Sequence, residues 1–417
     1  MQRSRTLDQR GNIIYVHANS TYTSGPDNTV TLIPSVRILG EGTYVDTNNV
    51  RQDVKHTIQI SGLGNVLLPR ATPTTFINRP LFANQLGDAV TLVSGSAAAS
   101  SEFSGFQIGD PTIASSGPAG RGIVGDGVAN VIANQNDINF AKGDGVFLNA
   151  ISGQVTMNGT VINNLGDPVN EIALHITNAA NGGRFNFGKE SNTSRTSRIN
   201  LEVPVGSLGG YSLSIDGTSA GSIIDMRNSD IFDGALQPVR RGGGVRLNNI
   251  NGQALLNNMT LVNTNGDGIE LTGGAGAGSR VSFVGAITVN GAATDSINIH
   301  DSSSSVNFTP SVVGSTISIQ NRNRVGFNVH NNPGGSIAVL QPITINTAAG
   351  ALPLFPALAY ENNAANLTFR PLQAAATVIA ISGGGRDGID IGVQGENTGQ
   401  FNVINGKTTI DQVTGVS

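Results

Sequence analysis

The amino-acid sequence contains no cysteine and no tryptophan. Without cysteine, the chain can form neither disulfides nor thiolate metal sites. Charged residues make up only 12% of the chain, and 24 basic against 28 acidic residues give a formal net charge of −4. This balance does not predict binding to DNA or RNA, which requires clustered positive charge. No run of about 20 apolar residues is present, so we expect no transmembrane helix.

Glycine, by contrast, is abundant, at 55 of 417 residues, and Asn, Ser, Thr, Val and Ile fill the places that Glu, Lys and Leu take in helical proteins. Such a composition predicts an all-β chain of short strands joined by tight turns. Hydrophobic residues, 38% of the chain, occur in ordered alternation, which argues against disorder.

A repeat is visible from Phe106 onward. A turn led by Gly, Asp or Ser precedes a pair of apolar residues in the pattern apolar-x-apolar, at Val146/Leu148, Val245/Leu247, Ile269/Leu271, Ile297/Ile299, Phe327/Val329 and Ile389/Ile391. The pairs Ile172/Leu174 and Leu358/Tyr360 fit the same position more loosely. Adjacent pairs lie 24 to 31 residues apart. A propeller blade needs about 40 residues, so this period favours a right-handed single-stranded parallel β-helix of roughly ten to thirteen coils.

The first part of the chain is less regular. Prolines 34, 69, 73 and 80 divide residues 11–110 into short strand-like pieces. We interpret residues 1–110 as an N-terminal cap with the first irregular coils, which covers the open end of the solenoid. A separate small domain is the alternative. Residues 111–417 are predicted to form the regular coils, which we expect to continue beyond the C-terminus.

The alternation also predicts which side chains face out. Ile269 and Leu271 should point inward, leaving Glu270 outside, next to Arg246 of the previous coil. We expect these two to form an exposed ion pair worth at most ~1 kcal/mol. Corner asparagines should adopt left-handed backbone or form side-chain ladders, at Asn249, Asn257, Asn258 and Asn263. The Asp-Gly pairs are interpreted as turns in which the glycine has positive φ, at Asp126, Asp144, Asp267 and Asp387.

Three histidines occupy what looks like one position of the repeat, directly after the second inward residue: His175, His300 and His330. His300 and His330 are one coil apart, so their side chains should lie about 5 Å from each other. With Asp301 they could hold a transition metal. Solvated surface histidines are the favoured interpretation, and we predict no metal site.

One cluster contains the residue types of an active site: Asp225, Asp230 and Asp233, followed by Arg240 and Arg241. Aspartate can serve as acid, base or calcium ligand, and arginine can bind a sugar carboxylate or act as a base. These are the groups that cleavage of a polyuronate would use. A chain with 28 acidic residues also produces such clusters by chance.

Several segments resemble known repeats: VIANQNDINFAKGDGVFL, QVTMNGTVINNLGD and QALLNNMTLVNTNGDGIEL. They are similar to the pectate-lyase-like superfamily of right-handed parallel β-helices, and more closely to bacterial surface proteins of the autotransporter-passenger or adhesin kind. The resemblance covers most of residues 11–417 and implies a fold more than an activity. The polygalacturonase signature Asn-Thr-Asp is replaced by Asn263-Thr264-Asn265, and the Gly-His-Gly of those enzymes is missing.

Three hypotheses about function follow. The leading one is a non-catalytic structural or adhesive β-helix, extracellular or on the cell surface, and part of a larger secreted protein. The second is a polysaccharide lyase or glycoside hydrolase acting on acidic polysaccharide, with calcium as cofactor if it is a lyase. The third is a carbohydrate-binding β-helix without turnover, using Phe147 or Tyr211 to stack on sugars. Apart from that calcium we expect no cofactor. Polysaccharide or other cell-surface components are the expected partners, and the sequence does not indicate an oligomeric state.

Overall fold

The computed structural model describes residues 12–23, 29–45, 51–60, 64–68, 78–163, 171–190, 195–200, 203–204, 210–233, 240–241, 244–275, 278–347, 354–372, 377–383, 388–392, 397–404 and 406–410. These residues are almost entirely β-strand and turn; their only helical element is a 3-10 turn, η1 (Ala114–Ser116). None of them forms a helix long and apolar enough to cross a membrane. Backbone contacts divide the chain into two compact units: unit 1 is Met1–Asp167 with Gly183–Arg198, and unit 2 is Pro168–Gly182 with Ile199–Ser417.

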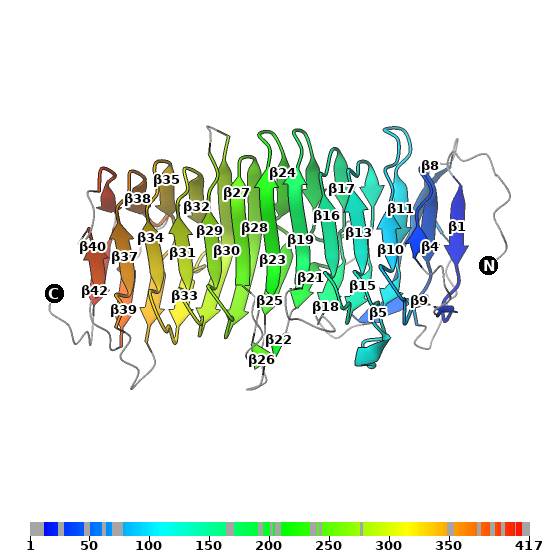
Figure 1. Ribbon diagram of the computed structural model, residues 1–417, viewed down its shortest axis with the longest axis horizontal. Helices are drawn as coiled ribbons and strands as arrows, with labels where there is room; N and C mark the ends of the chain where they lie inside the picture. The colour runs from blue at the N-terminus through cyan, green and yellow to red at the C-terminus, as the bar shows by residue number, and fades with distance from the viewer. Residues whose placement is uncertain are drawn as a thin grey trace. The chain divides into compact units, whose positions relative to one another are not determined.

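Unit 1 is built from three stacks of parallel strands (Figure 1). The first stack contains β1 (Ile13–Val16), β4 (Arg37–Gly40), β11 (Ser101–Ser104), β14 (Val131–Ile132), β17 (Gln154–Thr156) and β20 (Arg184–Asn186). The second contains β2 (Thr21–Tyr22), β9 (Leu81–Phe82), β12 (Gln107–Ile108), β15 (Asp137–Asn139) and β18 (Val161–Asn163). The third contains β3 (Val30–Thr31), β10 (Val90–Leu92), β13 (Ile123–Asp126) and β16 (Val146–Asn149). From β1 to β16, each coil therefore contributes one strand to each stack.

Two antiparallel hairpins interrupt the coils of unit 1. They are β5 (Thr43–Val45) with β6 (Arg51–Asp53), and β7 (Thr57–Ile60) with β8 (Gly64–Leu67). Both lie between β4 and β9 in the chain, in the section predicted to be irregular. The strands around them already pair as coils. The assignment of residues 1–110 to a cap stays a prediction.

Unit 2 has the same arrangement with longer strands (Figure 1). One stack contains β19 (Ile172–Ala179), β23 (Tyr211–Thr218), β27 (Gly244–Ile250), β29 (Ile269–Thr272), β31 (Ile297–His300), β34 (Phe327–His330), β37 (Leu358–Glu361) and β40 (Ile389–Ile391). A second contains β24 (Ile223–Met226), β28 (Gln253–Val262), β30 (Arg280–Asn290), β32 (Ser305–Thr309), β35 (Ser336–Val339), β38 (Asn366–Phe369) and β41 (Phe401–Val403).

The third stack of unit 2 contains β25 (Ser229–Asp233), the later parts of β28 and β30, then β33 (Ile317–Gln320), β36 (Ile343–Asn346), β39 (Thr377–Ser382) and β42 (Lys407–Ile410). A small antiparallel pair, β22 (Val203–Pro204) with β26 (Arg240–Arg241), lies apart from the coils. One more strand, β21 (Ser197–Asn200), has its first two residues in unit 1 and its last two in unit 2. The prediction of an all-β parallel solenoid is confirmed.

The core of each unit is a stack of inward apolar side chains. Ile269 and Leu271 are 0% and 1% exposed, as the alternation predicts, and Glu270 between them is half-buried. Aromatic side chains stack on one another in the same way, with the ring centroids of Phe283 and Phe308 4.8 Å apart. The last predicted pair differs. Ile391 is in register with Tyr360 but is 50% exposed, because no later strand of this stack covers it in the described part of the chain.

In each unit, the turn that follows one strand stack contains a residue with left-handed backbone conformation. The stack is β3 to β16 in unit 1 and β19 to β40 in unit 2. Residues with φ between 49° and 69° lie two positions after the second inward residue in nine coils: Gly127, Ala150, Asn178, Gly217, Asn249, Gly273, Asp301, Asn331 and Asn362. Gly and Asn tolerate this conformation best. The prediction is confirmed for Asn249 and for Asn263, which has φ 50°. Asn257 and Asn258 instead bond to neighbouring coils through their side chains, to Ser229 O and from Ala286 N.

The Asp-Gly pairs are not all alike. Gly127 has positive φ, as expected, but Gly145, which follows Asp144, and Gly268 do not, so the expectation was wrong for both of these pairs. A Cβ at Gly268 would lie 2.5 Å from Ser296 O and 2.5 Å from Val289 Cγ1. Glycine is therefore required there by the close approach of neighbouring backbone and side chains, and the expectation of positive φ was wrong at this position. Asp387 lies outside the described residues.

The position of His175 also needs correction. In the structure Leu174 and Ile176 pair with Leu213 and Ile215 of the next coil, which in turn pair with Val245 and Leu247. The inward pair of this coil is therefore Leu174/Ile176, two residues later than the predicted Ile172/Leu174. As a result His175 lies between the inward residues and does not share the position of His300 and His330.

Candidate functional site

The outward side chains of β19 to β34 in unit 2 form a continuous row of polar groups. We call this surface the polar belt and define it by His175, Tyr211, Asp216, Arg246, Asn248, Glu270, Asn298, His300, Asn328 and His330. All ten are half-buried, because each is flanked by outward side chains of the neighbouring coils. They therefore present ordered polar groups to solvent.

Asp216 is the best-connected residue of the polar belt. Its carboxylate accepts hydrogen bonds from Ser214 Oγ at 3.0 Å, Asn248 Nδ2 at 2.9 Å and Arg246 Nη2 at 3.2 Å, and lies 3.7 Å from His175 Nε2. Burial alone would raise the pKa of this carboxyl. The contact with His175, the hydrogen bond from Asn248 and the charge of Arg246 outweigh that effect and hold the pKa of Asp216 well below its usual range. Asp216 is thus ionised throughout the neutral range.

The expected ion pair between Arg246 and Glu270 does not form in the predicted way. The two residues are paired in register on adjacent coils, as predicted. Arg246 instead bonds to Asp216 of the previous coil, and its guanidinium carbon lies 5.7 Å from the centre of the Tyr211 ring. Glu270 contacts His300 of the following coil. Each charged group is therefore balanced by a group one coil away.

His300 lies between two carboxylates. Its Nε2 is 3.5 Å from Glu270 Oε1, and its Nδ1 is 2.8 Å from Asp301 Oδ2. The hydrogen bond to Glu270, with that to Asp301, outweighs the opposing effect of burial and raises the pKa of His300 to about 9. The same contact lowers the pKa of Glu270. At neutral pH His300 therefore carries a proton, and its two ring nitrogens face the carboxyl groups of Glu270 and Asp301.

The ring of His330 stacks on that of His300, with centroids 5.1 Å apart and planes within 5°. This confirms the predicted spacing of these two side chains. Burial and the charge of His300 lower the pKa of His330. Across the described part of the chain, no three His, Asp or Glu side chains are placed to hold a metal ion together. The metal hypothesis at His300, His330 and Asp301 gains no support from this geometry.

The predicted Asp225 cluster is only partly described. Ile224 and Met226 face inward, so Asp225 faces out on β24. Its carboxylate accepts two hydrogen bonds from the side chain of Arg227, at 3.0 and 2.6 Å. Burial would raise the pKa of Asp225, but the hydrogen bonds and charge of Arg227 outweigh it and lower this pKa. Asp230 lies half-buried on β25. The side chains of Asp233, Arg240 and Arg241 lie outside the described residues, so this active-site hypothesis stays a prediction.

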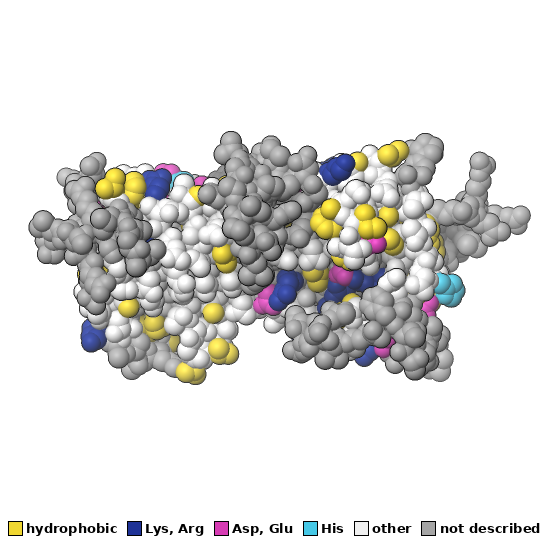
Figure 2. Space-filling model, turned by 90° about the horizontal axis from the view of Figure 1, so that it is seen from below, with side chains coloured by type: hydrophobic (Ala, Val, Ile, Leu, Met, Phe, Trp, Pro, Cys, Tyr) yellow, Lys and Arg dark blue, Asp and Glu magenta, His cyan; other side chains and the backbone are white. Residues whose placement is uncertain are grey.

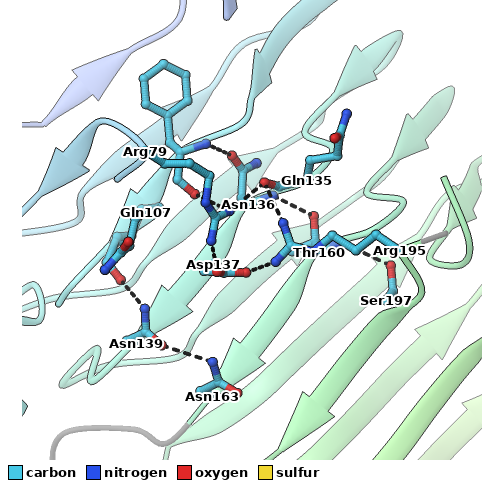
Figure 3. Close-up of polar contacts among 12 residues, drawn as sticks. Arg79, Gln107, Gln135, Asn136, Asp137, Asn139, Thr160, Asn163, Arg195 and Ser197 are labelled. Atoms are coloured by element: carbon cyan, nitrogen blue, oxygen red, sulfur yellow. Dashed lines mark hydrogen bonds and ion pairs between the residues drawn. The ribbon is translucent and has the colours of Figure 1, made fainter. Parts of the chain in front are cut away.

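Unit 1 contains a buried charge cluster that the sequence did not suggest (Figure 3). Both Arg79 and Arg195 pair with the carboxylate of Asp137, and the two arginine side chains are only 4% and 5% exposed. Both also donate to the backbone carbonyl of Gln135. The guanidinium of Arg195 lies 4.5 Å from the centre of the Tyr44 ring on β5. The cluster therefore ties the hairpin segment to the corner of the coils.

The side chain of Gln135 extends the same connection. Its amide donates to Lys55 O at 3.0 Å and accepts from Lys55 N at 3.4 Å, as a neighbouring strand would. Nearby, Asn139 accepts a hydrogen bond from Asn163 at 3.0 Å (Figure 3). This arrangement explains how an irregular insertion is held against regular coils, and we assign it a structural role.

The two aromatic residues proposed for sugar stacking are both half-exposed. The guanidinium of Arg121 covers Phe147 at 4.9 Å, and that of Arg246 lies near Tyr211. Tyr211 belongs to the polar belt of unit 2, whereas Phe147 lies on β16 of unit 1.

No family model, no curated protein and no solved structure matches this chain. Its fold and surface define its class by themselves: an all-β parallel solenoid with a row of mutually compensated polar side chains on one strand stack of unit 2.

Proposed function

We propose that the chain is a non-catalytic adhesive solenoid of the cell surface or extracellular space, and that the polar belt of unit 2 holds a polysaccharide. The support comes from the repeated geometry. Parallel strands are about 4.8 Å apart, so each coil offers a further set of outward donors and acceptors along the stack. A chain of sugars, which also repeats, can contact several such sets.

The belt has the chemistry that sugar hydroxyls require. The carboxylate of Asp216 accepts hydrogen bonds, and the planar amide of Asn248 both donates and accepts them. Arg246 can bind a carboxylate with two parallel hydrogen bonds, and Tyr211 supplies an aromatic ring. Because neighbouring coils already fix these side chains, little conformational entropy is lost on binding.

The rest of the molecule is consistent with contact over a broad surface. On the face shown in Figure 2, most of the described surface is backbone and uncharged polar side chains, with separate small groups of hydrophobic and charged residues. The resemblance of the repeats to the pectate-lyase-like superfamily and to bacterial surface β-helices supports the same proposal.

The observation that carries the non-catalytic part of the proposal is the set of hydrogen bonds that Asp216 accepts. A general acid or base must exchange a proton near the working pH. Asp216 accepts from three donors and has a pKa well below its usual range, so it remains an ionised anchor. It is suited to hold a hydroxyl or an arginine, and not to transfer a proton.

The test is binding to a panel of neutral and acidic polysaccharides, measured by calorimetry on the full chain. Arg246→Ala should weaken binding about tenfold, which corresponds to about 1.4 kcal/mol. Arg227→Ala is the matched control, because that arginine also pairs with an aspartate but lies in the turn after β24, which belongs to another strand stack. Equal affinities of both variants and the wild type would contradict the proposal.

A second function is favoured by one observation, the position of His300 between the carboxyl groups of Glu270 and Asp301, which raises the pKa of this histidine to about 9. A protonated imidazole beside a carboxylate can act as an acid in glycosidic bond cleavage. Release of unsaturated or reducing ends that disappears in His300→Gln but persists in Asp225→Ala would support cleavage at the polar belt. Loss in Asp225→Ala, with dependence on calcium, would instead point to the Asp225 to Arg241 cluster.

A further inference from the structure

Unit 1 has a cavity of about 350 Å³ that is separate from the polar belt. It opens beside β2, β9 and β12, where the outward positions Thr21, Leu81 and Gln107 are paired in register. Asn78 and the turn around Asp110 complete its wall. The volume is at the lower end of the range of small-ligand pockets, about 300–1,000 Å³.

One wall of this cavity is rigid. Arg79 lines it with a side chain that is only 4% exposed. Its guanidinium is held by the carboxylate of Asp137 and by the carbonyls of Phe106 at 3.3 Å and Gln135 at 2.9 Å (Figure 3). Because Asp137 and two backbone carbonyls hold the guanidinium of Arg79 in place, this wall supplies shape and order.

The open side of the cavity carries polar groups with unused hydrogen-bonding capacity. Asp110 Oδ1 accepts from the N–H and the hydroxyl of Thr112, at 2.8 and 2.6 Å, which leaves Oδ2 without a partner among the described residues. The side chain of Gln107 makes one weak contact, from Nε2 to Gly109 O at 3.4 Å. Among the residues that the structure describes, the side-chain amide of Asn78 has no hydrogen-bond partner, although its backbone N–H donates to Asn19 Oδ1 at 3.3 Å. The cavity thus offers a free carboxylate oxygen and two amides.

Apolar surface is present in the same place. Leu81 is half-exposed on β9, and Pro111 follows Asp110 in the lining turn. A pyranose has one face of C–H groups and an edge of hydroxyls, so an apolar surface beside planar polar groups suits it. The free oxygen of Asp110 accepts hydrogen bonds, which a sugar hydroxyl can donate and a sugar carboxylate cannot.

We propose that this cavity is a binding site for a single neutral pyranose. Leu81 and Pro111 contact the C–H face, Asp110 Oδ2 accepts from a ring hydroxyl, and the amides of Gln107 and Asn78 bond to the neighbouring hydroxyls. The site recognises one sugar unit or the end of a chain, and discriminates against uronates. It is independent of the polar belt and of the function proposed for that surface.

The experiment is saturation-transfer NMR and calorimetry on the full chain with methyl glycosides of glucose, galactose, mannose, N-acetylglucosamine and glucuronic acid. At least one neutral glycoside should bind with a dissociation constant on the order of 1 mM, and the glucuronide should bind at least tenfold more weakly. Gln107→Ala and Asp110→Asn should each weaken the neutral glycoside about tenfold or more. Gln154→Ala is the matched control, an exposed glutamine on β17 of the same unit.

Three results would overturn the proposal: no neutral glycoside binds, the two pocket variants bind as the control does, or the glucuronide binds equally well. The melting temperatures of all variants must match that of the wild type. If Gln107→Ala does not fold, Asp110→Asn still tests the cavity, because it keeps the shape of the side chain. Arg246→Ala should leave binding of the monosaccharide unchanged. Failure at the cavity is therefore distinguishable from failure at the polar belt.

Discussion

Replacing Asp137 with asparagine should destabilise unit 1 strongly. Asp137 is itself 21% exposed, but the two arginines that share its carboxylate, Arg79 and Arg195, are almost completely buried. Asparagine keeps the shape of the side chain and one acceptor oxygen, but removes the negative charge. Two guanidinium groups then remain in a poorly hydrated environment without that counter-charge.

The expected cost follows from this burial. Removing one partner of a buried ion pair costs about 3–5 kcal/mol, and the partial exposure of Asp137 argues for the lower figure, about 3 kcal/mol. In a unit of this size each kcal/mol lowers the unfolding midpoint by roughly 2–4 °C, so the midpoint should fall by roughly 6–12 °C. A surface ion pair would contribute at most ~1 kcal/mol.

Thermal unfolding followed by circular dichroism and calorimetry provides the assay. Asp225→Asn is the matched control, because its partner Arg227 is 54% exposed and the change should cost at most ~1 kcal/mol. Adding Arg195→Met to Asp137→Asn should recover part of the loss by removing one unpaired charge. If Asp137→Asn lowers stability no more than Asp225→Asn does, the cluster is not the structural tie that its burial indicates.

Three further predictions concern unit 2. Gly268→Ala should destabilise it by about 1–3 kcal/mol in urea unfolding, because the new Cβ would lie 2.5 Å from a carbonyl oxygen and a valine methyl, whereas Gly266→Ala, which meets nothing within 4 Å, should stay within about 0.5 kcal/mol. Asn363→Ala should cost about 2 kcal/mol or more and speed hydrogen exchange in adjacent coils, because the buried amide bonds to two carbonyls and accepts a backbone N–H. The pKa of His300 is raised, so its stabilising effect should be complete below about pH 6.5 and lost as pH rises through about 9; NMR titration should show this midpoint, and Glu270→Gln should lower it.

Sequence was sufficient to predict the architecture because the repeat imposes the same demand on every coil. Each inward pair, such as Ile269/Leu271 or Phe327/Val329, must stack on the pair before it, and a change of one residue would turn the apolar side chains outward. A period that recurs at 24 to 31 residues with this alternation leaves few other folds. The same repeat predicts that Arg246 and Glu270 lie side by side on adjacent coils, as the structure shows.

Local register was less predictable. In β19 the residues Ile172, Leu174 and Ile176 alternate without interruption, so the sequence offers two equivalent inward pairs. The choice is made by pairing with the next coil, which is tertiary information. The adjacent apolar residues Ile223 and Ile224 create the same ambiguity before Asp225. On such strands the alternation alone does not determine which side chains face outward.

The polar clusters were harder still. Arg79 and Arg195 each lie 58 residues from Asp137 in the sequence, one before it and one after it. No local sequence pattern marks the three residues as partners. Asp216 left a weak signal, an Asp-Gly pair at the end of a strand with a serine two residues before it. For Gly268, the sequence cannot separate a need for positive φ from a need for close approach, since glycine satisfies both.

The central claim is that the polar belt binds polysaccharide without cleaving it. The most direct measurement is mass spectrometry of a bound polysaccharide before and after incubation, combined with binding by wild type and Arg246→Ala. We predict a polysaccharide retained by the wild type, recovered at its original length, and held about tenfold more weakly by the variant. Shortened chains, or equal retention by wild type and variant, would contradict the claim.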